Sequence, residues 1–224
     1  MIAAAWIAVT AALYAAARAL HRRFPRPWLT PLLVVPGALA ALLLAARVPY
    51  PGYMQGGRLL VDLLGPATVA FALPLHRHAG LLRRHAAELC AGILAGCAVA
   101  VGSSFLLARA LGLARPLALS LAPRSITTPF AMQVAGDLGG VPALAAVFVI
   151  LTAVVGLVVG QLLVRWLPLR SPVARGALFG MGAHAAGTAQ AMELGRVEGA
   201  VAGVVMIVAG LGVLVATPLL RLAL

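Results

Sequence analysis

The chain has 224 residues, of which 63% are hydrophobic and 10% are charged, and its mean hydropathy is +1.06. A soluble domain has about 25% charged residues, and it cannot hide this much apolar surface in one core. The composition excludes a disordered chain, a disulfide-rich secreted scaffold and a cytosolic enzyme. It predicts an integral membrane protein whose solvent is the lipid bilayer.

The formal net charge of +12 comes from 17 arginines, no lysine and five acidic residues. The arginines lie between apolar runs and form no continuous basic stripe, so they indicate charge at the cytoplasmic membrane surface and not a nucleic-acid interface. The sequence contains no motif of a hydrolase, metalloprotease or phosphate loop, and Cys90 and Cys97 have no metal-ligand spacing. We therefore expect no enzymatic activity, no cofactor and no metal.

Apolar runs of about 20 residues predict the membrane helices in chain order. Residues 1–17 form a retained span and not a secretory signal, because the basic residues follow the apolar run and do not precede it. Residues 27–46 form the second span, and a loop rich in Pro and Gly is expected at 48–57. Then follow a shorter apolar stretch at 63–75 and clear spans at 89–108, 138–164 and 199–220.

Arginine clusters at 18–26, 77–84 and 165–175 set the predicted orientation, because such clusters stay in the cytoplasm. For the span 138–164 to end at the third cluster, the interrupted stretch 117–137 has to enter and leave the membrane on one side. We therefore expect that stretch to be re-entrant. If it crossed the membrane instead, the third cluster would lie outside.

These features predict an all-α, polytopic membrane protein with about seven membrane segments. Two of the segments, 117–137 and 172–195, are expected to be broken or re-entrant because Gly, Pro, Thr and single polar residues interrupt them. The whole chain, residues 1–224, is expected to form a single transmembrane domain, with two N-terminal spans in 1–57 and a core in 58–224.

The two interrupted segments share a short pattern. Thr128-Pro-Phe-Ala-Met-Gln-Val recurs sixty residues later as Thr188-Ala-Gln-Ala-Met-Glu-Leu. In an Ala-rich chain, a match of this length has two possible explanations, a structural repeat and chance. If the repeat is real and 117–137 is re-entrant, the two motifs enter from opposite faces. Such an inverted pair builds the substrate site of many carriers.

Each motif also carries signals of a broken helix. Thr128 suits an N-cap and Pro129 the first helical position, while Pro123 interrupts any helix upstream. In the second motif, Ser171-Pro172 is expected to start a helix, and Thr188 to cap a new half-helix that ends at Gly195. Glycines between these two points weaken the helix: Gly180, Gly182 and Gly187.

Polar side chains gather beside both breaks, and a polar group at membrane depth is a functional candidate because it is costly there. They are Arg124, Ser125, Thr127, Thr128, His184, Thr188, Gln190 and Glu193. Free N–H groups after Thr128 and Thr188 would form an anion site. We expect Arg124 to hold a carboxylate in this site. Hydroxyl and amide groups would bond the substrate's hydroxyl or keto oxygen: Ser125, Thr127 and Gln190.

His184 and Glu193 are the candidates for proton coupling. Structural alternatives stay open for the charged and titratable side chains. Arg124 can lie near the outer interface and extend its head to water, and His184 can bond a carbonyl in the packed interior. Glu193 can pair locally with Arg196.

The two core motifs, Pro123-Arg-Ser-Ile-Thr-Thr-Pro-Phe-Ala-Met and Ala183-His-Ala-Ala-Gly-Thr-Ala-Gln-Ala, resemble those of the LrgB/CidB family. The likeness runs from about residue 58 to the C-terminus and includes Leu64-Gly-Pro-Ala-Thr and Glu198-Gly-Ala. The family pattern has Lys at the position of Arg124. Arginine keeps the positive charge there and can bind a carboxylate through two hydrogen bonds.

This resemblance implies two kinds of function. Some family members are described as antiholin-like regulators of murein hydrolase export and cell lysis that work with a small holin-like LrgA/CidA partner. Others carry glycolate and glycerate, or are linked to pyruvate uptake. From the site residues we expect a transporter of small 2-hydroxy or 2-oxo monocarboxylates in the bacterial inner membrane, with the antiholin-like regulator as the alternative. A homo-oligomer stays open.

Overall fold

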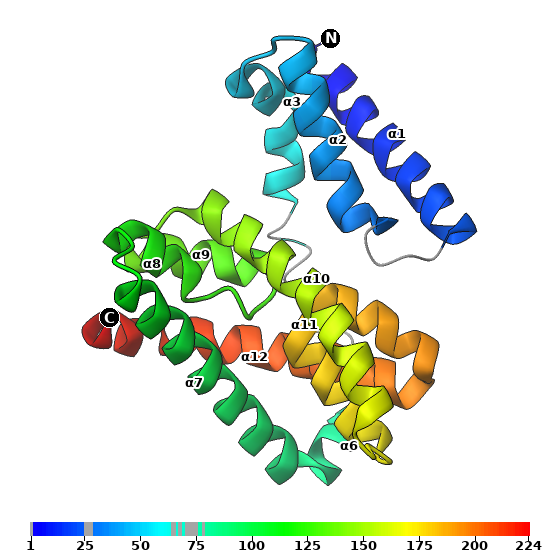
Figure 1. The fold of residues 1–224 in the computed structure, drawn as a ribbon, viewed down its shortest axis with the longest axis vertical. Coiled ribbons are helices and arrows are strands. Elements are labelled where there is room, and N and C mark those ends of the chain that lie inside the picture. Colours follow the sequence, from blue (N-terminus) through cyan, green and yellow to red (C-terminus); the bar gives the residue numbers. More distant parts are fainter. Residues whose placement is uncertain (1, 25–28, 64–65, 67–68, 70–75, 78) are drawn as a thin grey trace. The chain divides into compact units, whose positions relative to one another are not determined.

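The computed structural model describes residues 2–24, 29–63, 66, 69, 76–77 and 79–224, and within these ranges the regular structure is entirely helical. The chain divides into two compact units, Met1–Ala70 and Phe71–Leu224 (Figure 1). The all-α fold expected from the sequence is confirmed for the described residues. Among the described residues, four helices are long and apolar enough to cross a membrane: α1, α7, α10 and α12.

The N-terminal unit contains α1 (Ile2–Arg23), α2 (Pro31–Ala45) and α3 (Tyr50–Asp62), with α2 and α3 both packed on α1. The expected loop at 48–57 is wrong, because α3 covers most of it. Pro51 is tolerated in the first turn of a helix, and Gly56 lets α3 approach the backbone of Ala3. The expected short apolar segment at 63–75 lies mostly outside the described residues.

The C-terminal unit holds every candidate site residue. Its long helices α7 (Ala86–Ala110), α10 (Pro142–Trp166) and α12 (Arg196–Ala223) agree with three of the spans expected from hydropathy. The other helices of this unit are α6 (Ala79–Arg84), α8 (Arg115–Leu121), α9 (Thr128–Leu138) and α11 (Pro172–Leu194).

Helix α11 folds back on itself at His184, whose backbone angles are φ 50° and ψ −126°. Beyond this residue the chain returns along its own first half. A Cβ on Gly187 would collide with the carbonyl of Phe179, which an uninterrupted helix would hold about 12 Å away along its axis. We call residues 172–194 the second hairpin and His184 its tip.

The second hairpin corrects the expected position of the break. The sequence placed a new helix start at Thr188, but the hydroxyl of Thr188 donates a 3.0 Å hydrogen bond to the carbonyl of His184, inside the returning limb. The expected start and end of the segment are confirmed. Ser171 caps the first limb by accepting a hydrogen bond from the Ala174 amide at 3.4 Å, and the second limb ends at Gly195.

Residues 115–138 form the first hairpin, in which α8 and α9 are joined by the turn 122–127. The chain returns to α8, because the amide of Val141, just after α9, donates a 2.7 Å hydrogen bond to the hydroxyl of Ser120 in α8. The N-cap of α9 is Thr127, one residue before the expected Thr128, and its side chain makes no capping bond. Gly139, at φ 90°, ends α9 in the left-handed conformation that favours glycine.

The tips of both hairpins contact the middle of α10. Arg124, at the first tip, bonds Thr152, and Gly156 lies so close to the backbone of Gly182 that no Cβ would fit between them. Since Gly182 is two residues from the second tip, the two tips lie within about one helical turn of each other along α10. The pair Gly156/Gly160 therefore lets the second hairpin pack closely on α10.

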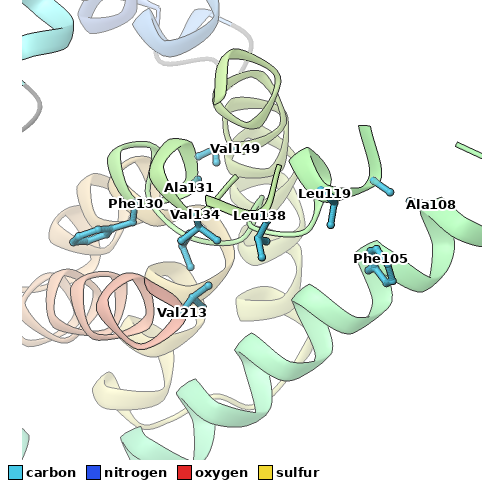
Figure 2. Close-up of a cluster of buried hydrophobic side chains, with 11 residues drawn as sticks. Phe105, Ala108, Leu119, Phe130, Ala131, Val134, Leu138, Val149 and Val213 are labelled. Carbon is cyan, nitrogen blue, oxygen red and sulfur yellow. The ribbon is translucent and has the colours of Figure 1, made fainter. Parts of the chain in front are cut away.

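An apolar cluster fixes the first hairpin against the long helices. Figure 2 shows Val134 of α9 and Val213 of α12 pointing toward one another, with Phe105 of α7 nearby. Phe130 lies against Gly210 near the middle of α12. Because these residues are almost fully buried, the cluster holds the first hairpin in a fixed position against α7 and α12.

Candidate functional site

Arg124 lies at the first tip and is held by hydroxyl groups from two long helices. Its Nε donates a 2.6 Å hydrogen bond to Ser104 in α7, and its Nη1 lies 3.4 Å from the hydroxyl of Thr152 in α10. Ser104 in turn donates to the carbonyl of Ala100 at 2.6 Å, which fixes the direction of its oxygen lone pairs. The guanidinium is thus oriented through Nε, while Nη2 forms no hydrogen bond within the described part of the chain.

A cavity of about 800 Å³ lies beside this arginine, between α7, α10 and the two hairpin tips. Its polar lining comes from four side chains: Ser103, Arg124, Ser125 and Thr152. No acidic residue lines it. All five acidic residues of the chain lie in the described part, and none forms an ion pair with Arg124. The cavity therefore presents a positive charge that lacks a partner in the protein.

His184 lies at the second tip and is buried, with 3% of its surface exposed. Its imidazole lies beside the backbone of Ser125 and within electrostatic range of Arg124. Neither ring nitrogen completes a hydrogen bond of acceptable geometry. The two tips are therefore in contact through residues that the sequence had marked in separate motifs.

The second limb places the remaining polar candidates away from the cavity. Gln190 accepts a 2.9 Å hydrogen bond from Gln161 of α10 and donates one of 3.1 Å to Glu193. Glu193, which the sequence paired with Arg196 as the alternative to proton coupling, is exposed and bonds Gln190 instead. Neither residue, nor Thr188, lines the cavity.

Among the hydroxyl residues of the first motif, too, some line the cavity and others do not. Ser125 lines the cavity, whereas Thr127 is buried outside the lining and Thr128 is half-buried in the first turn of α9. The structure therefore brings Arg124, Ser125 and His184 together and leaves the other candidates outside.

Three polar residues at these contacts were not predicted from the sequence. Ser104 and Thr152 bond Arg124, and Gln161 bonds Gln190. Each is one of the few polar residues within a largely apolar span. That was a usable signal, because polar side chains in a membrane helix often bond another element.

A half-buried ion pair was also missed. Arg175, expected as one of the cytoplasmic surface charges, lies in the first turns of α11 with its Nη2 3.5 Å from Oε1 of Glu198 in the first turn of α12. Glu198 is 7% exposed and also lies over Gly195. The pair joins the two ends of the second hairpin at its base.

The arrangement at the tips is suited to a small anion. The returning limbs, α9 and residues 185–194, both begin at the tips, so their positive dipole ends and free N–H groups face the same region as Arg124. A carboxylate there would receive charge-assisted hydrogen bonds that are shorter and stronger than neutral ones.

Comparison with known proteins gives the family. The LrgB-like family model matches residues 10–222. An uncharacterized Bacillus subtilis protein, YwbG, is 45% identical over 95% of this chain and 94% of its own length. The holin-like protein CidB of Staphylococcus aureus is 31% identical over 90% of this chain and 88% of its own length. No solved structure matches the chain. The chain is therefore a multi-pass membrane protein that belongs to the LrgB-like family.

Proposed function

We propose that this protein carries small 2-hydroxy or 2-oxo monocarboxylates, such as pyruvate, glycolate or glycerate, across the bacterial inner membrane. The observation that supports it most strongly is Arg124, oriented toward a cavity by Ser104 and Thr152 with no acidic partner. A charge at this depth without a counter-ion is costly. A carboxylate ligand would supply the missing charge.

The proposed topology makes both hairpins re-entrant, from opposite faces of the membrane. In support, α10 separates the hairpins, and their tips lie side by side at its middle. The sixty-residue offset that aligns Thr128 with Thr188 also aligns Arg124 with His184, and each of these lies at a tip. Labelling of single cysteines near 115 and 170 tests this topology, because the two positions should react from opposite sides.

The substrate would bind at the tips. Its carboxylate would be held by Arg124 and by amides at the start of the returning limbs. A 2-oxo oxygen would accept a hydrogen bond from Ser125, whereas a 2-hydroxy group could accept from or donate to Ser125. His184, buried beside Ser125, is the group that we propose to exchange a coupled proton. Glu193 is a second candidate for coupling, at the exposed end of the returning limb.

The test is uptake of labelled pyruvate and glycolate into proteoliposomes that contain this chain alone. We expect saturable uptake that is lost in Arg124→Ala and retained in Arg109→Ala, a matched change at the end of α7 outside the cavity. Uptake by Arg124→Ala with unchanged affinity would disprove the proposed site.

The second candidate function is a holin-like or antiholin-like role in murein hydrolase export and lysis, acting with a small LrgA/CidA-type partner. The observation that favours it is the likeness to CidB, which is named holin-like. This function predicts leakage of an unrelated dye of similar size from the same proteoliposomes, with or without the partner. Selective uptake without leakage favours the carrier.

A further inference from the structure

We propose that the cavity beside Arg124 takes monocarboxylates with an aliphatic tail in preference to compact, fully polar ones. This inference rests on the proposed function and narrows its substrate class.

The polar side chains of the cavity gather in one part of it: Ser103, Arg124, Ser125 and Thr152. Phe148 and Leu151 line the cavity before Thr152 on α10, and beyond the polar group the lining continues along α7 and α10 as apolar residues or glycine: Ala95, Gly96, Val99, Val155, Val159 and Gly182. From Thr152 to Val159 this apolar part covers about 10 Å of α10. The cavity therefore has a charged head end and an apolar extension.

The volume leads to the same conclusion. At about 800 Å³ the cavity is of the size that holds a drug-sized ligand, so the three carbons of pyruvate or glycerate would occupy only its polar end. The rest would hold water against apolar walls, which an aliphatic tail would displace favourably.

The apolar end of the cavity is also open between α7 and α10. Val99 of α7 and Val155 of α10 are 68% and 61% exposed although both line the cavity. A tail longer than the cavity would extend between these two helices toward an apolar environment, whereas a terminal hydroxyl would lose its hydrogen bonds there. The geometry thus selects against polar groups at the far end of the ligand and tolerates chain length.

A substitution at Gly182 can fill the apolar part of the cavity. A Cβ at this position meets no atom within 4 Å, so a larger side chain would project into the cavity without displacing the backbone. Gly92 of α7 is a matched control, because its Cβ also meets nothing within 4 Å and it lies outside the lining.

The experiment measures direct binding to the full chain in lipid nanodiscs by calorimetry, for pyruvate, 2-oxobutanoate, 2-oxopentanoate, 4-methyl-2-oxopentanoate and glycerate. We expect the dissociation constant to fall about threefold to fourfold for each added methylene group, and glycerate to bind more weakly than 2-oxobutanoate. In Gly182→Leu this dependence on tail length should disappear, and in Gly92→Leu it should remain. Val159→Phe, on the open wall, provides a second way to fill the cavity.

Equal or weaker binding of the longer acids, or no binding of any of them, would overturn the inference. A dependence on tail length that persists in both Gly182→Leu and Val159→Phe would also overturn it. Because binding is measured without transport, the two proposals can fail separately. Tail-dependent binding without uptake would contradict only the carrier, and uptake of pyruvate without tail dependence would contradict only this inference.

Discussion

The Nε of Arg124 and the hydroxyl of Ser104 are joined by a 2.6 Å hydrogen bond that links the tip of the first hairpin to α7. Ser104 is 2% exposed, and its own proton is directed to the carbonyl of Ala100. The serine oxygen can therefore act only as an acceptor for the guanidinium. This relationship fixes which nitrogens of Arg124 remain available for a ligand.

Replacement of Ser104 by Ala should weaken carboxylate binding without unfolding the protein. A hydrogen bond to a charged group contributes about 1.5–3 kcal/mol, so the KM for uptake should rise about tenfold or more. Thr217→Val is the control, because that buried hydroxyl bonds only its own helix at Val213. An unchanged KM in Ser104→Ala, measured in proteoliposomes, would show that Arg124 is oriented without it.

Replacement of Arg124 by Lys should retain part of the uptake that Arg124→Ala loses. Lysine keeps the positive charge but cannot donate through Nε to Ser104 while binding a carboxylate through two parallel bonds. We expect an intermediate KM, measured as initial uptake rates over a range of pyruvate concentrations. If Lys and Ala behaved alike, the charge itself would not be what binds the substrate.

His184→Gly should be more stable than His184→Ala. At φ 50° and ψ −126° the backbone at the second tip is in a region that only glycine enters without strain, and such strain costs about 1–3 kcal/mol. In an ordinary helix interior the order is reversed, with Ala more stable by about 1 kcal/mol. Thermal unfolding of both variants in detergent decides between a strained tip and a regular helix.

Gly156→Val should destabilise the protein by more than about 2 kcal/mol, because a side chain there collides with the backbone of Gly182 in the second hairpin. Gly92→Val, on the open side of α7, should change the unfolding midpoint little. Equal effects of the two substitutions would mean that the second hairpin does not pack on α10 as described.

Glu198→Gln should destabilise the base of the second hairpin by about 1–3 kcal/mol, since it leaves the charge of Arg175 without its partner, 3.5 Å away. Glu88→Gln is the comparison. Glu88 pairs with His85 at the exposed end of α7, where a surface pair contributes about 0–1 kcal/mol. Denaturation curves for the two variants, and for Arg175→Met combined with Glu198→Gln, measure the coupling.

Features that depend on local composition could be predicted from the sequence alone. Long charge-free runs predict α7, α10 and α12 because a bilayer-crossing helix needs about 20 apolar residues wherever they occur. Polar and Pro/Gly interruptions identified the two segments that became hairpins. Arg124 stood out for the same reason, as a lone charge in an apolar stretch.

Packing between helices sets where the chain reverses and which groups meet, and local sequence does not show either. Local rules placed the second break at Thr188, after Gly187, yet the chain turns at His184, a non-glycine residue, for which a positive φ is uncommon. This turn is held by contacts with another helix, α10, such as the close approach of Gly156 to the backbone of Gly182. Likewise Ser104 and Thr152 reach Arg124 from positions 20 and 28 residues away. Hydropathy is read from consecutive residues. The site is formed by residues that are far apart in the sequence, and only the packing of the helices brings them into contact.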